Sequence, residues 1–134
     1  MTSPPPLDRI PPPPLVTGEA PIDVDHLARM TLGDGTLRRE VLAMFVRQTD
    51  ELLRRLAARA GDGAALAHTL KGSARAIGAF RVAACAEALE GAIRQAGDPS
   101  RGDPSRGDPS RALAELDAVV AEARASIEAI LARP

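Results

Sequence analysis

Residues 64–77 read Ala-Ala-Leu-Ala-His-Thr-Leu-Lys-Gly-Ser-Ala-Arg-Ala-Ile, and this stretch decides the fold. Its apolar residues recur three or four positions apart, the spacing of one face of an α-helix. This predicted core face consists of Leu66, Leu70, Ala74 and Ile77. A second stripe has the same spacing but is polar, so we expect it to face water. It consists of His68, Lys71, Gly72 and Arg75.

Helix-breaking residues flank this stretch, with Gly61-Asp62-Gly63 before it and Gly78 after it. The same helical period recurs outward along the chain. We predict a short helix over 25–32 and long helices over 36–60, 80–96 and 109–132.

Each long helix has an apolar stripe that we expect to face the core. In 36–60 the predicted stripe is Leu37, Val41, Met44, Phe45, Gln48, Leu52 and Leu56. In 80–96 it is Val82, Cys85, Ala86, Leu89 and Ile93. In 109–132 it is Leu113, Leu116, Val120, Ala123, Ile127 and Ile130. The fold class predicted is all-α, an antiparallel up-down four-helix bundle with a short extra N-terminal helix.

Two segments lack this period. Residues 1–21 hold eight of the twelve prolines, which favours a disordered, solvated tail over a PxxP ligand for a partner. Residues 97–111 repeat Gly-Asp-Pro-Ser-Arg three times, so we predict a flexible loop over 97–108. At its end, Asp108 and Pro109 suit the N-cap and first position of the last helix. The domain prediction is therefore a tail at 1–21 and one helical domain over 22–134.

Composition excludes several classes of protein. The chain of 134 residues has a net charge of −1 and only 1% aromatic residues, which argues against nucleic-acid binding. No apolar run approaches the roughly 20 residues of a membrane span, and no signal-peptide pattern is present. Cys85 is the only cysteine, so neither an internal disulfide nor a thiol metal site is expected. We expect a cytoplasmic protein without a metal site of its own.

The polar stripe holds the candidate site. Lys71 is the only lysine beside sixteen arginines, which suggests a position that needs a compact charge. His68, one turn away, can act as a nucleophile, since a neutral imidazole is available near pH 7. Gly72 costs about 1 kcal/mol relative to Ala inside a helix, so we expect it to leave room for a docking partner. For Arg75, contact with a partner or phosphate and simple solubility are equally plausible.

This arrangement suits the transfer of a phosphoryl group. Lys71 can offset the charge that would arrive on His68. The sequence contains neither a GxxxxGK[ST] loop nor a kinase glycine-rich loop, so it is not expected to take phosphate from ATP. The metal ion and the phosphoryl donor would have to come from a partner.

The run Ala67-His68-Thr69-Leu70-Lys71-Gly72-Ser73-Ala74, followed by Ile77-Gly78, resembles the signature of histidine-containing phosphotransfer (HPt) domains. The flanks agree at Phe45, Cys85, Leu89 and Glu90, and the resemblance covers about 22–132. It implies a four-helix bundle in which His68 is phosphorylated on a ring nitrogen. It also implies that Lys71 stabilises the phosphate and that Gly72 leaves room for the partner.

The partners implied are response-regulator receiver domains, which supply Mg²⁺, and hybrid or sensor histidine kinases. The function predicted is a phosphorelay intermediate that shuttles a phosphoryl group between receiver aspartates and His68, as a monomer and without kinase activity or a cofactor of its own. The alternative is a non-catalytic helical adaptor in which His68 is never modified. His26, the other histidine, lacks such neighbours, and we expect it to be structural or solvated.

Overall fold

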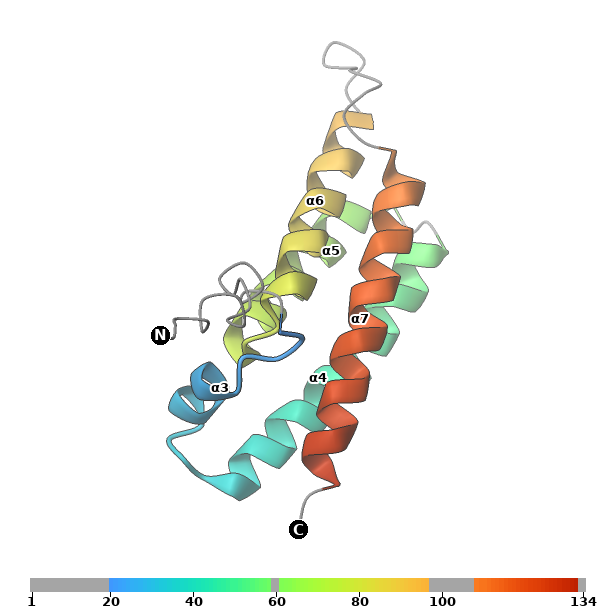
Figure 1. The fold of residues 1–134 in the computed structure, drawn as a ribbon. Coiled ribbons are helices and arrows are strands. Elements are labelled where there is room, and N and C mark those ends of the chain that lie inside the picture. Colours follow the sequence, from blue (N-terminus) through green and yellow to red (C-terminus); the bar gives the residue numbers. More distant parts are fainter. Residues whose placement is uncertain (1–19, 59–60, 97–107, 133–134) are drawn as a thin grey trace, which may run out of the picture.

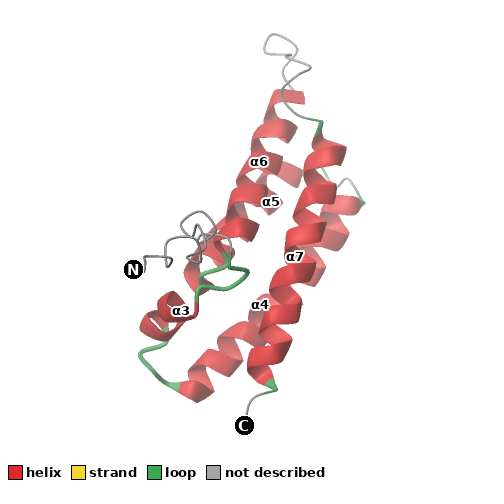
Figure 2. Ribbon diagram, viewed as in Figure 1, coloured by secondary structure: helices red, strands yellow, loops and turns green. Residues whose placement is uncertain are grey.

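The computed structural model describes residues 20–58, 61–96 and 108–132, and this part of the chain contains helices but no strand (Figure 2). The helices are α3 (Val24–Met30), α4 (Gly35–Ala57), α5 (Gly63–Ile77), α6 (Phe80–Ala96) and α7 (Pro109–Leu131). Most of the predicted Pro-rich tail and nearly all of the predicted loop at 97–108 lie outside the described residues.

The four long helices form the bundle predicted from the sequence. Each packs against the next along the chain, and α7 closes the bundle by also packing against α4 (Figure 1). Helix α3 lies against α5. An ion pair between Asp50 of α4 and Arg124 of α7 joins the first and last long helices, with one pair of atoms 3.0 Å apart. The all-α fold class is therefore confirmed.

Aspartates begin three of the helices. The side chains of Asp23, Asp34 and Asp108 accept hydrogen bonds from backbone N–H groups in the first turns of α3, α4 and α7. Such a cap contributes about 1 kcal/mol, because those N–H groups have no partner within the helix. The predicted cap at Asp108 is confirmed. Asp62 precedes α5, but its carboxylate accepts instead from Arg55, at 3.0 Å.

The core of the bundle agrees with the predicted faces of three helices. All four predicted core residues of α5 are buried. In α6 and α7 every predicted residue is buried or packs against the core.

In α4 the predicted core stripe is partly wrong. Leu37 is 37% exposed, Met44 is 58% exposed and Gln48, the one polar member of the stripe, is exposed as well. By contrast, Leu42, which was not predicted, is fully buried. Two apolar stripes run side by side on this helix. The period of the sequence does not say which stripe packs against the neighbouring helices. The buried stripe, which contains Leu42, lies about one residue further round the helix than the predicted one.

The junction between α3 and α4 also corrects a prediction. Helix α3 ends at Met30 rather than at Leu32. Leu32 has a left-handed φ of 54° and a side chain that is 87% exposed, and Gly33 follows with a φ of 73°. A left-handed residue cannot continue a right-handed helix, so the chain turns here into α4.

The end of α5 fixes this helix against the N-terminal segment. Gly78 has a φ of 86°, as expected for a glycine that caps a helix, and its carbonyl oxygen accepts from the Asp23 backbone N–H at 2.9 Å. A Cβ atom at Gly78 would lie 2.8 Å from the Asp23 carbonyl oxygen. Just beyond Gly78, the rings of Phe80 and His26 pack edge to face with centroids 5.1 Å apart. We call this region, made of Asp23, His26, Gly78 and Phe80, the Gly78 corner.

Candidate functional site

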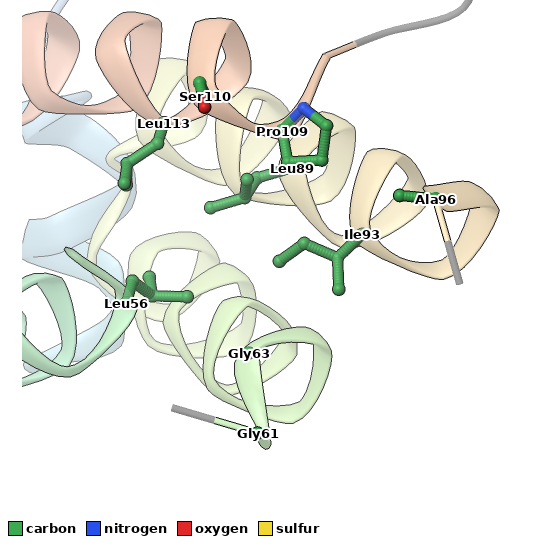
Figure 3. Close-up of a pocket in the computed structure, with 9 residues that line it drawn as sticks. All are labelled: Leu56, Gly61, Gly63, Leu89, Ile93, Ala96, Pro109, Ser110 and Leu113. Carbon is green, nitrogen blue, oxygen red and sulfur yellow. The ribbon is translucent and has the colours of Figure 1, made fainter. Parts of the chain in front are cut away.

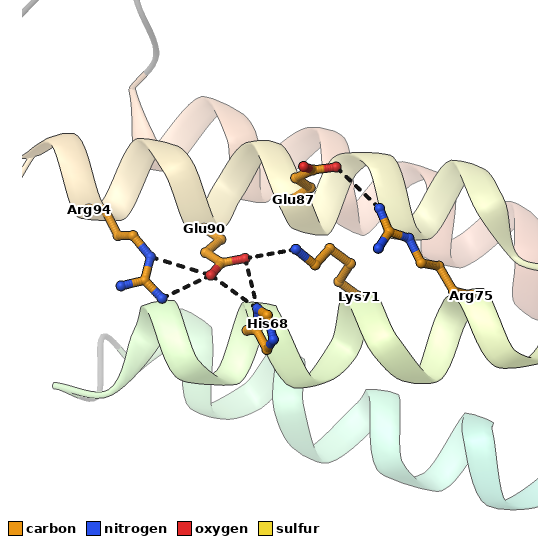
Figure 4. A network of polar contacts seen from close by, with 6 residues as sticks. All are labelled: His68, Lys71, Arg75, Glu87, Glu90 and Arg94. Carbon is orange, nitrogen blue, oxygen red and sulfur yellow. Dashed lines mark hydrogen bonds and ion pairs between the residues drawn. The ribbon is translucent and has the colours of Figure 1, made fainter.

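His68 lies in the middle of α5, on the side that faces water near α6. Its side chain is 63% exposed. The ring nitrogen Nδ1 is turned toward Glu90 of α6, at 3.2 Å from Oε2 and 3.3 Å from Oε1. The other ring nitrogen, Nε2, lies on the side of the ring turned away from this carboxylate (Figure 4). The neighbouring helix therefore holds one edge of an otherwise accessible imidazole.

Glu90 is the centre of a charged network that joins the two helices. Its side chain is 12% exposed, and three basic groups surround it. Besides His68, Arg94 donates to Oε2 at 2.9 Å and the Lys71 ammonium lies 3.4 Å from Oε1 (Figure 4). The Arg94 hydrogen bond is the main cause that lowers the pKa of Glu90 to about 2, and His68 and Lys71 contribute, although burial opposes them. Glu90 is thus an anion at neutral pH.

This charge determines which nitrogen of His68 carries the hydrogen. A carboxylate can only accept hydrogen bonds, so Nδ1 must be the donor in the contact with Glu90. In a neutral imidazole the proton on Nδ1 leaves a lone pair on Nε2. The nitrogen that points away from Glu90 is therefore the nucleophilic one.

Lys71 is placed differently from the solvated ammonium expected from the polar stripe. Its side chain is only 15% exposed and reaches across to Glu90. It remains one helical turn from His68 on the same side of α5. An anion bound to Nε2 would compete with Glu90 for this ammonium.

Arg75 and Gly72 complete the α5 strip predicted from the sequence. The Arg75 guanidinium lies 3.5 Å from Glu87 of α6, and both side chains are more than half exposed. Apart from the neighbouring residues and backbone of its own helix, no described atom comes within 4 Å of the position that a Cβ would occupy at Gly72. The packing of the chain therefore gives no reason for a glycine here, whereas the Gly78 corner requires one.

The structure brings all four predicted residues together and adds three from α6. We call this surface the His68 face, made of His68, Lys71, Gly72 and Arg75 on α5 and of Glu87, Glu90 and Arg94 on α6. From the sequence, Glu87 and Glu90 are expected to pair with arginines, as they do here with Arg75 and Arg94, but none of the three α6 residues was placed at the site. One signal was available, because Glu90 is a charged residue beside Leu89, among the inward positions of its helix.

The other residues considered as candidate sites are less suited to nucleophilic or metal chemistry. His26 is half-buried, and its Nε2 is buried without a hydrogen-bond partner among the described residues. The Cys85 thiol has a pKa raised mainly by burial and then by Glu115, which disfavours the reactive thiolate. A search of the described residues for clusters of three or more His, Cys, Asp or Glu able to hold a metal found none.

A pocket of about 220 Å³ opens at the end of the bundle distant from the Gly78 corner (Figure 3). The side chains that line it are apolar except for the Ser110 hydroxyl. The lining residues are Leu56, Gly61, Gly63, Leu89, Ile93, Ala96, Pro109, Ser110 and Leu113. Apart from the Ser110 hydroxyl, these side chains offer no group for acid–base or nucleophilic chemistry, so the His68 face remains the candidate site.

Comparison with known families identifies the family of this chain. Residues 40–129 match the Hpt domain family, which is well over half of the chain, and the protein belongs to that family. The matched range contains the whole His68 face. Searches of curated proteins and of solved structures found no match.

Membership of this family gives the general function. Hpt domains act in histidine phosphotransfer within phosphorelays, where they interact with receiver domains and histidine kinases. None of the helices in the described ranges is long and apolar enough to cross a membrane.

Proposed function

We propose that this protein is a phosphorelay intermediate in which His68 accepts a phosphoryl group from a receiver aspartate and passes it to another receiver. One observation carries the proposal: the His68 ring is exposed, and Glu90 holds its Nδ1 so that Nε2 presents a lone pair to the solvent. A partner protein can reach this nitrogen, whereas the imidazole of His26 is half-buried against Phe80.

The transfer step follows from this geometry. The Nε2 lone pair attacks the phosphorus of the partner's aspartyl phosphate, so an N–P bond forms while the O–P bond to the aspartate breaks. The electron pair of the broken bond stays on the aspartate, which leaves as a carboxylate. The Nδ1 hydrogen remains in place, and the positive charge that develops on the ring faces the Glu90 carboxylate. Reversal of the same step delivers the phosphoryl group to a second receiver.

The basic residues of the His68 face supply charge compensation. Phosphoryl transfer depends more on positioning and electrostatic stabilisation than on covalent help from the protein. Lys71 and Arg94 both contact Glu90, and each can turn to the phosphoryl oxygens once these arrive on Nε2. The Mg²⁺ ion that assists the reaction would belong to the receiver.

A phosphotransfer assay tests the proposal. A receiver domain phosphorylated on its aspartate is mixed with the wild-type chain, with His68→Gln and with the matched control His26→Gln. We expect wild type and His26→Gln to gain phosphate that is stable in alkali and lost in acid, and His68→Gln to gain none. Equal labelling of wild type and His68→Gln would refute the proposal. If none of the proteins is labelled by any receiver or kinase, the adaptor function becomes the better interpretation.

A further inference from the structure

A second glycine lies beside His68, on the opposite helix. Gly91 is inside α6, and apart from the neighbouring residues and backbone of its own helix no described atom lies within 4 Å of the position of a Cβ there. A glycine inside a helix costs about 1 kcal/mol relative to Ala. Gly63, by contrast, has a packing reason, because its Cβ would lie 3.2 Å from Ile93 Cδ1. Gly91, like Gly72, is not explained by the fold.

The position of Gly91 links it to the site. It directly follows Glu90, which contacts His68, so it lies at the height of His68 along the α5–α6 pair. It is four residues after Glu87 and three before Arg94, so it lies on the side of α6 that carries these two residues. Gly72 therefore lies one turn along α5 from His68, and Gly91 lies across from His68 on α6.

Two arginines flank His68 on this surface. Arg94 and Arg75 lie on opposite sides of His68 along the helix pair, and their side chains are 61% and 56% exposed (Figure 4). An anionic partner that approaches Nε2 would meet guanidinium groups at both ends of this surface and, at Gly72 and Gly91, positions without a side chain. This combination suits a domain that presents a phosphorylated carboxylate at a protruding surface.

We propose that the docking surface for the receiver domain spans both α5 and α6, with Gly91 as the α6 contact that allows close approach beside His68. The inference rests on the proposed function and extends the docking surface beyond Gly72. The role of Gly91 is steric, because a side chain at position 91 would hold the partner's aspartate too far from Nε2 for in-line attack.

The test uses an uncharged, long side chain that forms helices well. Gly91→Gln, Gly72→Gln and the control Ala118→Gln are compared, since Ala118 is exposed on α7, which packs against α6 and α4. Each variant is labelled in two ways, by a phosphorylated receiver and by phosphoramidate, a small donor that needs no docking surface. Circular dichroism and thermal unfolding establish that each variant is folded.

We expect Gly91→Gln to lower the rate of transfer from the receiver by about tenfold or more, because a misplaced reacting atom is costly. Labelling by phosphoramidate should stay at the wild-type rate, and Ala118→Gln should match wild type with both donors. Wild-type receiver transfer in Gly91→Gln together with slow transfer in Gly72→Gln would overturn the inference while leaving the proposed function intact. Equal loss of labelling with both donors would also overturn it, because the effect would then lie in the reacting group and not in docking.

Discussion

The His68 face and the Gly78 corner each contain a histidine and a glycine. At the corner these residues are closely packed, whereas on the face they are open to solvent. At the corner, a Cβ on Gly78 would lie 2.8 Å from a backbone oxygen, and the His26 ring packs on Phe80. On the face, a Cβ on Gly72 would meet no described atom within 4 Å, and the His68 side chain is 63% exposed.

This difference separates residues that the fold requires from residues that it does not. Gly78 supplies a left-handed φ and a close backbone contact, so it is explained without any partner. Gly72 and Gly91 weaken their helices and receive no compensation within the described chain. Residue type alone does not distinguish the two cases, whereas the atoms around each residue do. Substitutions in the His68 face and in the Gly78 corner test this separation.

The largest effect on phosphotransfer is expected from Glu90 on the His68 face. Glu90→Ala removes the acceptor that holds Nδ1 of His68, so the ring loses its orientation and the preference for a lone pair on Nε2. We expect phosphotransfer to slow by about 10- to 100-fold, because positioning dominates this chemistry. Single-turnover transfer from a phosphorylated receiver measures the rate.

Glu87→Ala is the matched control for this prediction. Glu87 lies on the same helix and contacts Arg75, at 3.5 Å, with both side chains more than half exposed. Such exposed pairs contribute about 0 to 1 kcal/mol, so the transfer rate should change by less than about fivefold. If the two variants are slowed equally, Glu90 has no special relation to His68.

The largest effect on the free energy of unfolding is expected at the Gly78 corner. Gly78→Ala forces a residue with a Cβ into a φ of 86° and against the Asp23 carbonyl oxygen. We expect the free energy of unfolding to fall by about 2 to 4 kcal/mol, which combines left-handed strain with displacement of the N-terminal segment. Urea denaturation measures it. A stability equal to that of wild type would mean that the corner does not need its glycine.

The sequence predicted α5 and its exposed histidine well, and the reason is local. The period of Leu66, Leu70, Ala74 and Ile77 defines the buried face, and the opposite placement of His68 then follows. The partners of His68 depend on how α6 is aligned with α5, which the period of either helix does not specify. The contacts of Glu90 and Arg94 with the site could therefore not be derived from spacing.

The errors in α4 and α3 have the same origin. Leu37 and Met44 lie on an apolar stripe, but the neighbouring helices cover the adjacent stripe that contains Leu42. Leu32 has a good helical propensity, and it adopts a left-handed conformation because the chain must turn there into α4. In both cases tertiary packing overrode a correct local preference.

A smaller effect is the pH dependence that Glu90 gives to stability. Its pKa falls from 4.5 to about 2 in the folded protein, mainly through the hydrogen bond from Arg94. A group with a lowered pKa stabilises the fold above its unfolded pKa, and this contribution is lost as the pH falls toward the folded pKa. The stability that Glu90 contributes should therefore be complete at neutral pH and decline from about pH 4.5 down to about pH 2.

The comparison of wild type with Glu90→Gln isolates this contribution, because every other carboxylate is present in both proteins. The difference between their free energies of unfolding, measured in urea across the acid range, should shrink as the pH is lowered. A difference that stays constant from neutral pH to about pH 2 would show that the charge of Glu90 does not contribute to stability.

The smallest change in the free energy of unfolding is expected at Gly72. Its sign is opposite to that of the change at Gly78. Gly72→Ala places a methyl group where no described atom lies within 4 Å, so it adds no clash and removes the entropic cost of glycine in a helix. The free energy of unfolding should rise by about 0.5 to 1 kcal/mol, measured by urea denaturation. Receiver transfer should be equal to or slower than in wild type, never faster. A loss of stability in Gly72→Ala would place this glycine with Gly78, among the residues that the fold itself requires, and would remove the steric argument for docking beside His68.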